Sequence, residues 1–418
     1  MGTPASGLAL DMTLSTTAVV DNRVPGTMWL VAGGIFAMVT SEFMAAGLLP
    51  AIAEDIGVTI GAAALLISGF AAGQVFGAWL IGMPLSRFGP RTVLAGLLVA
   101  FAVAQTIGVL SPWPVMLGLR AVSGMVMSAY FSIALGTATR VVPGPAQPRA
   151  VAAVFTGVTV GTTLGLPLAT FAGQAMAWRF AFHLDTVAVL VAALAIRFAV
   201  PVIGGVPAMS LAEAARPLRS GRLWLTFATA ALTIGATLLA FGFFSAILQQ
   251  VTGVDAMLVP WLLALYGVAS VIGNWLVGRM TAAGPSRVVV VGLVVLVAGL
   301  LAFWAFPTVL PVAVAGLVAV GLSGVSLNAA HTARTVRVGG SNPAVMAMMP
   351  TIVTGGILFG TAAGAVAVDS SLGLLAPLWM GAALAVAGLL TVLPDLRRRA
   401  REPAHSSARP EAPLCLAG

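Results

Sequence analysis

Apolar runs of about twenty residues recur along the whole chain, and short segments between them hold most of the charged residues. Each run is long enough to cross ~30 Å of hydrocarbon as an α-helix. The pattern predicts an all-α polytopic membrane protein with twelve spans, at 28–50, 60–82, 92–111, 113–138, 150–174, 180–203, 222–249, 257–279, 287–306, 309–333, 344–368 and 372–394.

Composition supports this class and excludes others. Hydrophobic residues make up 60% of the 418 residues and charged residues 8%, whereas a soluble domain carries about 25% charged residues. The chain has no lysine, so a Walker A motif for ATP hydrolysis is excluded. Its single cysteine, Cys415, excludes an internal disulfide and a cysteine-based zinc cluster. No catalytic triad or metal cluster is evident, so we expect neither an enzyme nor a cofactor or metal.

The positions of the arginines predict how the protein is oriented in the membrane. Every second connection is basic, and the opposite connections contain Glu54, Asp55, Asp255 and Asp369, with Arg179 as their arginine. The positive-inside rule then predicts that both termini are cytoplasmic. Because the net charge of +8 follows this topology, we expect no nucleic-acid partner. The basic connections contain Arg87, Arg91, Arg140, Arg149, Arg216, Arg219, Arg222, Arg279, Arg287, Arg334, Arg337, Arg397, Arg398, Arg399 and Arg401.

The longest polar interruption, 204–221, predicts a cytoplasmic linker between a first bundle, 28–203, and a second bundle, 222–394. Residues 1–27 lack the basic start of a signal peptide and are predicted to be a cytoplasmic tail, as is 395–418.

An internal repeat supports two equivalent halves. The segment GAWLIG at Gly77 recurs as GNWLVG at Gly273, and Arg91 and Arg287 follow the two copies at the same spacing. Transporters built from parallel repeats show this pattern.

Several motifs carry a family resemblance. GMPLSRFGPR, from Gly82 to Arg91, contains a glycine-arginine pattern between the second and third spans. LRAVSG begins at Leu119, AWRFAF at Ala177 and LQQVTGV at Leu248, and TSEFMAAGLLP lies in the first span. GVTVGTTLGLPLATFAG contains Gly157, Gly161, Gly165 and Pro167.

Together these segments resemble the twelve-helix drug:proton antiporter branch of the major facilitator superfamily, near the chloramphenicol and arabinose efflux permeases, over about 28–395. The resemblance implies two six-helix bundles and export by alternating access. It assigns Gly82, Arg87, Gly89 and Arg91 to a cytoplasmic gate loop and the glycine-proline segment to the antiporter motif. Ser86 stands where the family has an acid that latches the gate, so we expect the latch to rely on Arg87, Arg91 and backbone contacts.

Glu42 and Arg120 are the candidate proton-coupling residues. At 1.5 Å per residue, Glu42 lies roughly 12 Å and Arg120 roughly 10 Å below the same outer face. Ionisable groups at such depth are costly and mark functional sites. An acid whose surroundings alternate between a cation and a wet cavity changes its proton affinity. The alternative is a static ion pair that joins the first and fourth helices.

Other residues complete the candidate site. Gln74 is deep enough to face a cavity, and Phe241, Phe243 and Phe244 offer an aromatic wall for an apolar ligand, although lipid-facing phenylalanine is equally common. We interpret Gly157, Gly161 and Gly165 as a sliding interface between the halves, with plain tight packing as the alternative. We interpret Asp185 and His183 as solvated at the outer boundary, and Asn328 and His331 as boundary residues near the cytoplasm.

We therefore expect a proton-coupled antiporter, in the inner or plasma membrane of a bacterium, that exports a small, largely apolar compound such as a drug. Its expected partners are that compound, protons and the lipid bilayer, and we expect a monomer. Efflux of a sugar or other polar metabolite is the first alternative. A transport-inactive sensor or scaffold on the same fold is the second.

Overall fold

The computed structural model describes residues 25–141, 146–202, 204, 220–281, 284–340 and 343–399. All regular structure in these residues is helical, and twelve helical spans within them are long and apolar enough to cross a membrane. The predicted all-α fold with twelve spans is confirmed. Most of the predicted linker, 204–221, and of the predicted tails, 1–27 and 395–418, lies outside the described residues.

Two of the first six spans contain a π-helical turn. The second span runs from α3 through η1 into α4, and the fifth runs from α7 through η3 into α8. A proline, Pro84 or Pro167, follows each π turn two residues later, and its missing N–H group interrupts regular helical bonding. The elements of this half are α1 (Gly26–Gly47), α2 (Leu49–Ile56), α3 (Ile60–Gly77), η1 (Ala78–Gly82), α4 (Met83–Leu85), α5 (Pro90–Leu110), α6 (Trp113–Val141), α7 (Gln147–Val160), η3 (Gly161–Gly165), α8 (Leu166–Ala175) and α9 (Trp178–Ala199).

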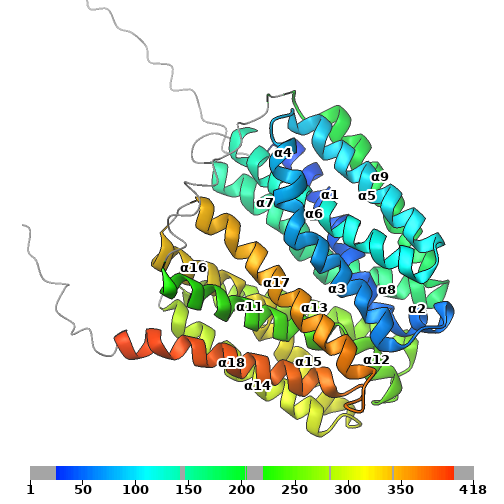
Figure 1. Cartoon of the computed structure of the whole chain (residues 1–418), viewed down its shortest axis with the longest axis vertical. Helices are drawn as coiled ribbons and strands as arrows, with labels where there is room; N and C mark the ends of the chain where they lie inside the picture. Colours follow the sequence, from blue (N-terminus) through cyan, green and yellow to red (C-terminus); the bar gives the residue numbers. More distant parts are fainter. Residues whose placement is uncertain are drawn as a thin grey trace, which may run out of the picture.

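The other six spans form the second group of helices (Figure 1). Its first span, α11 with α12, is the most buried, which places it inside the protein. The elements are α11 (Gly221–Phe241), α12 (Phe244–Gln250), η5 (Ala256–Leu258), α13 (Val259–Thr281), α14 (Pro285–Ala305), α15 (Leu310–Ser323), η6 (Val325–Leu327), α16 (Asn328–Gly339), α17 (Pro343–Val368) and α18 (Ala376–Arg399).

The two ends of the helix bundle differ in charge. We call the end that carries Arg87, Arg140 and Arg279 the arginine-rich face, and the end that carries Asp55 and Asp369 the arginine-poor face.

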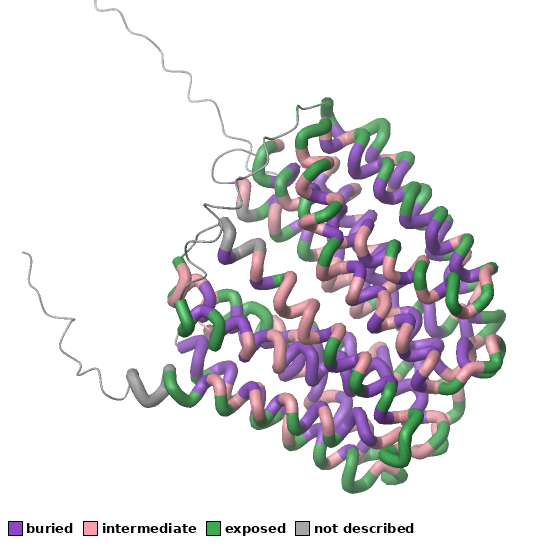
Figure 2. The backbone as a smooth tube through the Cα atoms, viewed as in Figure 1, coloured by how far each residue is buried: buried purple, intermediate pink, exposed green. Residues whose placement is uncertain are grey.

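Exposed apolar side chains follow the outer surfaces of the helices. On α5 they are spaced three or four residues apart, so that they form one stripe, while the buried residues lie inside the protein (Figure 2). A continuous exposed apolar stripe fits contact with lipid rather than water. The stripe on α5 comprises Val99, Val103, Ile107 and Leu110.

The repeated glycine motif packs in the same way in both halves. A Cβ atom on Gly77 would lie 2.1 Å from the carbonyl oxygen of Met125 on α6, and one on Gly273 would lie 2.3 Å from that of Leu322 on α15. Both distances are far below van der Waals contact, so only glycine fits. The two copies therefore place equivalent glycines where the second helix of each half crosses the fourth.

Candidate functional site

Glu42 lies on α1 and is partly accessible. The side chain of Gln74, on α3, lies beside the Glu42 carboxyl group. Gln74 Nε2 also donates a hydrogen bond to Met127 Sδ on α6 at 3.6 Å. The structure therefore brings together two polar residues that the sequence placed at depth.

Arg120 is buried on α6, with 5% of its surface exposed. Its Nη1 donates to Ser41 Oγ at 3.2 Å, and its Nη2 donates to the carbonyl oxygens of Ser41 at 3.2 Å and Glu42 at 3.4 Å. The guanidinium also lies 4.6 Å from the centre of the Phe70 ring. No ion pair within 4.0 Å joins the Arg120 guanidinium to the Glu42 carboxyl group, and the structure describes both of these side chains. Arg120 thus holds the backbone of α1 beside Glu42 instead of pairing with its carboxylate.

A buried polar chain extends from Ser41 away from Glu42. Ser41 Oγ donates to Gln105 Oε1 on α5. Gln105 Nε2 donates to Asp185 Oδ2 at 2.9 Å, with the Phe182 carbonyl oxygen at 3.1 Å and Thr186 Oγ1 at 3.0 Å. Next to this chain, a small cavity lined by Gln105, Arg120 and Phe182 has room for about one water molecule.

The interpretation of Asp185 as a solvated boundary residue is wrong. Asp185 is 6% exposed and hydrogen-bonded inside the first half, whereas its neighbour His183 is partly exposed. Asp185 is seven residues beyond Trp178, at the start of α9, which puts it roughly 10 Å below the arginine-poor face, at the depth of Arg120. Counting residues from the helix end, as for Glu42 and Arg120, would have identified Asp185 as a deeply placed residue. His331 is fully buried on α16, although Asn328 is exposed.

The phenylalanines at Phe241, Phe243 and Phe244 neither line an open wall nor face lipid, because each is at most 2% exposed. Phe241 lies 4.6 Å from Tyr266 and 5.6 Å from Phe43, measured between ring centres. Since Phe43 belongs to the first half and is partly exposed, these rings form a hydrophobic junction between the halves. The aromatic wall was predicted from residue type alone, which does not indicate what a helix packs against.

The glycine stripe packs within the first half. Cβ atoms on Gly157, Gly161 and Gly165 would lie within 3 Å of atoms of α1, among them the Ala32 carbonyl oxygen at 2.3 Å. Tight packing is therefore the correct interpretation, and the predicted sliding interface between the halves is wrong for these three residues. Another residue of η3, Thr163, faces the other half, because a Cβ atom on Gly267 of α13 would lie 2.9 Å from its Cα atom.

The predicted gate loop makes its polar contacts inside the first half. Ser86 Oγ donates to the Met83 carbonyl oxygen at 2.7 Å, and Arg91 Nε donates to the Arg197 carbonyl oxygen at the end of α9. Arg87 is exposed, and its guanidinium lies 5.1 Å from the centre of the Phe88 ring. Gly82 is buried and Gly89 precedes the first residue of α5.

Ser86→Asp is expected to favour the conformation in which the arginine-rich face is closed, because it restores the family acid beside Arg87 and Arg91. An exposed charge pair contributes at most ~1 kcal/mol, or about fivefold in a conformational equilibrium. Labelling of single cysteines from each face, in a Cys415→Ser background, measures the ratio of the two conformations. Ser86→Asn, of the same size and uncharged, is the control. Equal labelling of the two variants would contradict a charge-based latch.

Three described hydrogen bonds between the halves lie toward the arginine-poor face, where α2 and α12 lie side by side (Figure 1), whereas Trp79 Nε1 donates to Thr351 Oγ1 at 3.1 Å nearer the arginine-rich face. Asp369, after α17, accepts hydrogen bonds from Thr59 Oγ1 and from the Gly61 backbone N–H, the latter at 3.1 Å. Ser245 Oγ donates to the Gly47 carbonyl oxygen at 2.8 Å. Opening this face requires these bonds to break.

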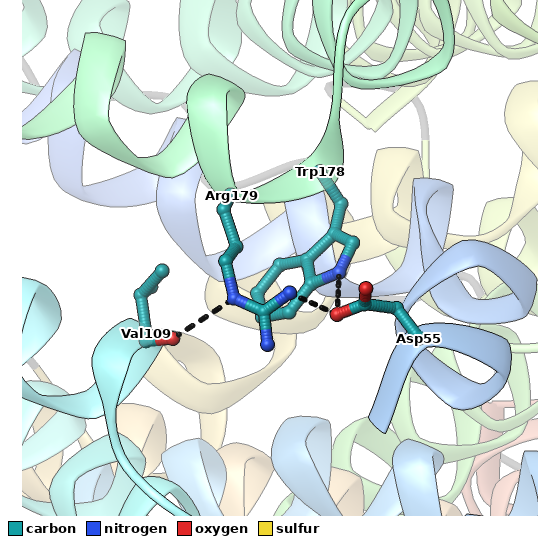
Figure 3. A network of polar contacts seen from close by, with 4 residues as sticks. All are labelled: Asp55, Val109, Trp178 and Arg179. Atoms are coloured by element: carbon teal, nitrogen blue, oxygen red, sulfur yellow. Dashed lines mark hydrogen bonds and ion pairs between the residues drawn. The ribbon is translucent and has the colours of Figure 1, made fainter. Parts of the chain in front are cut away.

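Asp55 is the centre of a second polar group on the arginine-poor face (Figure 3). Its Oδ2 accepts a hydrogen bond from Trp178 Nε1 at 3.0 Å and pairs with Arg179, whose Nε donates to the Val109 carbonyl oxygen at 3.4 Å. The Trp178 hydrogen bond, followed by the bond and charge of Arg179, lowers the pKa of Asp55 from its ordinary value of 3.8. These contacts join α2 to the ends of two spans, α5 and α9.

Asp55→Asn is expected to lower the free energy of unfolding by no more than ~1 kcal/mol, because the ion pair is about half exposed to solvent. A depressed pKa gives stability that is present above about pH 4 and is lost as pH falls through the folded-state value. Thermal unfolding in detergent between pH 3 and 7 should show this loss in the wild type and not in Asp55→Asn. Glu54→Gln changes an exposed neighbour and should lose stability at low pH as the wild type does. An equal loss of stability at low pH in Asp55→Asn would show that Asp55 is not the group responsible.

The sequence matches the model of the Major Facilitator Superfamily over residues 31–334, most of the chain and parts of both halves. The chain belongs to the major facilitator superfamily. It is 32% identical to a chloramphenicol resistance protein of Streptomyces lividans over 386 residues, 89% of this chain and 96% of that protein. It is 27% identical to a chloramphenicol efflux pump of Mycobacterium tuberculosis, over 67% of this chain and 68% of that protein.

A solved structure shares the fold of the family. The human organic anion transporter MFSD10 superposes with a TM-score of 0.61 at 17% identity, covering 88% of this chain and 98% of that chain. The expected family is thereby confirmed, and the protein is a transporter rather than an enzyme. With twelve apolar spans and bacterial relatives, it is a multi-pass protein of a bacterial plasma membrane.

Proposed function

We propose that this transporter exports a small, largely apolar compound, such as a chloramphenicol-like antibiotic, in exchange for protons. The observation that carries the proposal is the position of Glu42. It is a partly accessible carboxyl group inside a membrane span, next in sequence to the serine that Arg120 binds. An acid in that position can meet a proton from a wet cavity and remain close to a buried cation. The chloramphenicol relatives support the class of compound.

Alternating access requires the two halves to separate at one face at a time. We propose that the arginine-rich face is cytoplasmic, in keeping with the positive-inside rule. The bonds at Asp369 and Ser245 then favour a conformation that is closed on the outer side. In this proposal the protein works as a monomer in the bilayer. It needs no cofactor, and the proton is the coupling ion.

Export of a polar metabolite is a second candidate, and one observation favours it. Gln74 lies beside Glu42 and is partly accessible, whereas Phe241, Phe243 and Phe244 are buried. A site lined by an amide and a carboxyl group suits hydroxyl-rich ligands. Phe43, which follows Glu42 in the sequence, is partly exposed.

A resistance panel tests the two candidates together. The protein is expressed in a bacterial host that lacks its own efflux pumps, and growth is measured against amphenicols, other apolar antibiotics and toxic sugar analogues, with an empty vector as control. Resistance to the apolar compounds that disappears when an ionophore collapses the pH gradient is the expected result. Resistance confined to sugar analogues would favour the second candidate. Resistance that survives collapse of the gradient would overturn proton coupling.

A further inference from the structure

The buried polar chain that starts at Arg120 ends at a carboxylate, Asp185. Arg120 Nη1 donates to Ser41 Oγ, Ser41 Oγ donates to Gln105 Oε1, and Gln105 Nε2 donates to Asp185 Oδ2. Every bond therefore runs in the same direction, from the cation to the anion. In a medium of low dielectric constant such bonds polarise one another. The chain thus stabilises a positive Arg120 together with a negative Asp185.

The carboxyl group of Glu42 lies outside this chain. Arg120 donates to the backbone carbonyl of Glu42, and the Glu42 side chain lies beside Gln74. One cation is therefore shared by two carboxyl groups, and if both were ionised the buried site would carry an uncompensated negative charge. The arrangement is neutral when Asp185 is ionised and Glu42 holds a proton.

Few other charged groups face Asp185. Helix α9 packs mainly against α5, α1 and α8. Helix α8 has no titratable residue, Glu42 is the charged residue of α1, and that of α5 is Arg91, at the opposite end. On α9 itself, His183 is partly exposed, Arg179 pairs with Asp55 at the arginine-poor face, and Arg197 lies in the last turn, at the opposite end. Arg120 on α6, reached through Ser41 and Gln105, is therefore the cation that balances Asp185.

We propose that Asp185 is a positioning residue that acts as the charge partner of Arg120 and so leaves Glu42 as the carboxyl group that exchanges protons. Without Asp185, Glu42 is the remaining carboxyl group that can balance the charge of Arg120. Glu42 should then bind its proton less tightly, and loading should require a lower pH. The link to export rests on the proposed function, whereas the assignment of charges does not.

Chemical labelling tests the assignment without a substrate. Dicyclohexylcarbodiimide reacts with protonated carboxyl groups in apolar surroundings, so mass spectrometry of the purified full-length protein from pH 5 to 9 gives the fraction of Glu42 that is protonated. We expect Asp185→Asn to lower the midpoint of Glu42 labelling by at least about one pH unit, a tenfold change in proton affinity. Asp185→Glu should stay close to the wild type. Asp255→Asn, the same change on the surface of the other half, is the control.

A second variant, Gln105→Leu, keeps the test possible if Asp185→Asn does not fold. Gln105→Leu interrupts the chain without changing a charge and should shift Glu42 labelling in the same direction. An unchanged profile in whichever of Asp185→Asn and Gln105→Leu accumulates would overturn the proposal. Export of chloramphenicol into inverted membrane vesicles is measured in parallel. A labelling shift in a protein that does not export would preserve the charge assignment while the proposed function fails.

Discussion

Replacing Glu42 with glutamine should abolish export driven by a pH gradient while leaving the amount of protein in the membrane unchanged. Glutamine has nearly the same shape and can still contact Gln74, but it cannot release a proton. Glutamine is neutral, like the protonated acid, so it adds no buried charge and the variant should be no less stable than the wild type. We expect gradient-driven export to fall at least about tenfold, since no proton can be bound and released at this position.

Uptake of chloramphenicol into inverted vesicles with an imposed pH gradient measures this loss, and immunoblotting measures the protein. Glu54→Gln makes the same chemical change at an exposed position of α2 and should transport like the wild type. Exchange of labelled for unlabelled compound without a gradient should persist in Glu42→Gln, because it requires no net proton movement. Undiminished gradient-driven export by well-expressed Glu42→Gln would remove Glu42 from the coupling role.

The sequence predicts the fold well because the forces that select it act on each segment separately. A bilayer requires long apolar helices, so twelve spans can be placed from hydrophobicity before any packing is known. The glycine motif at Gly77 and Gly273 identifies equivalent helix crossings because only a residue without a side chain fits there. Both features follow from local constraints, and both agree with the structure.

The candidate site is harder to predict, since counting residues gives the depth of a side chain but not its direction around the helix. Depth alone correctly placed Glu42 near Arg120. It could not show that Arg120 contacts the α1 backbone through Ser41, or that Gln105 connects the same serine to Asp185. For the same reason the partner of the glycine stripe and the burial of Phe241 were predicted wrongly. These features depend on how neighbouring helices are rotated, which is decided by packing across the whole bundle.

Arg120→Ala separates a proton-coupling site from a static link between helices. If Arg120 mainly joins α6 to α1, its loss should reduce stability, because it leaves buried carboxyl groups without a cation. Removing one member of a buried charge pair costs about 3–5 kcal/mol, and removing both costs much less. The double variant Glu42→Gln with Arg120→Ala should then recover both protein yield and gradient-driven export.

If Arg120 instead tunes a working acid, the outcome differs. Arg120→Ala should fold, and Glu42 should hold its proton more tightly without the nearby cation, so that the pH optimum of export moves upward. This shift is opposite in sign to the one expected for Asp185→Asn. Arg120→Lys keeps the charge but not the forked geometry that reaches Ser41 and two carbonyl groups, so it should show a smaller shift.

The test is a double-mutant cycle of the wild type, both single variants and the double variant. Protein yield and the pH profile of export are measured for each of the four. We expect the double variant to accumulate in the membrane but to show no gradient-driven export, since it lacks the proton-exchanging carboxyl group whatever its stability. The contacts of Arg120 argue against a static charge pair, because two of its hydrogen bonds go to carbonyl oxygens of the α1 backbone and no described ion pair joins it to the Glu42 carboxyl group. Restored gradient-driven export in the double variant would show that the pair is a static link and that the proton is carried elsewhere.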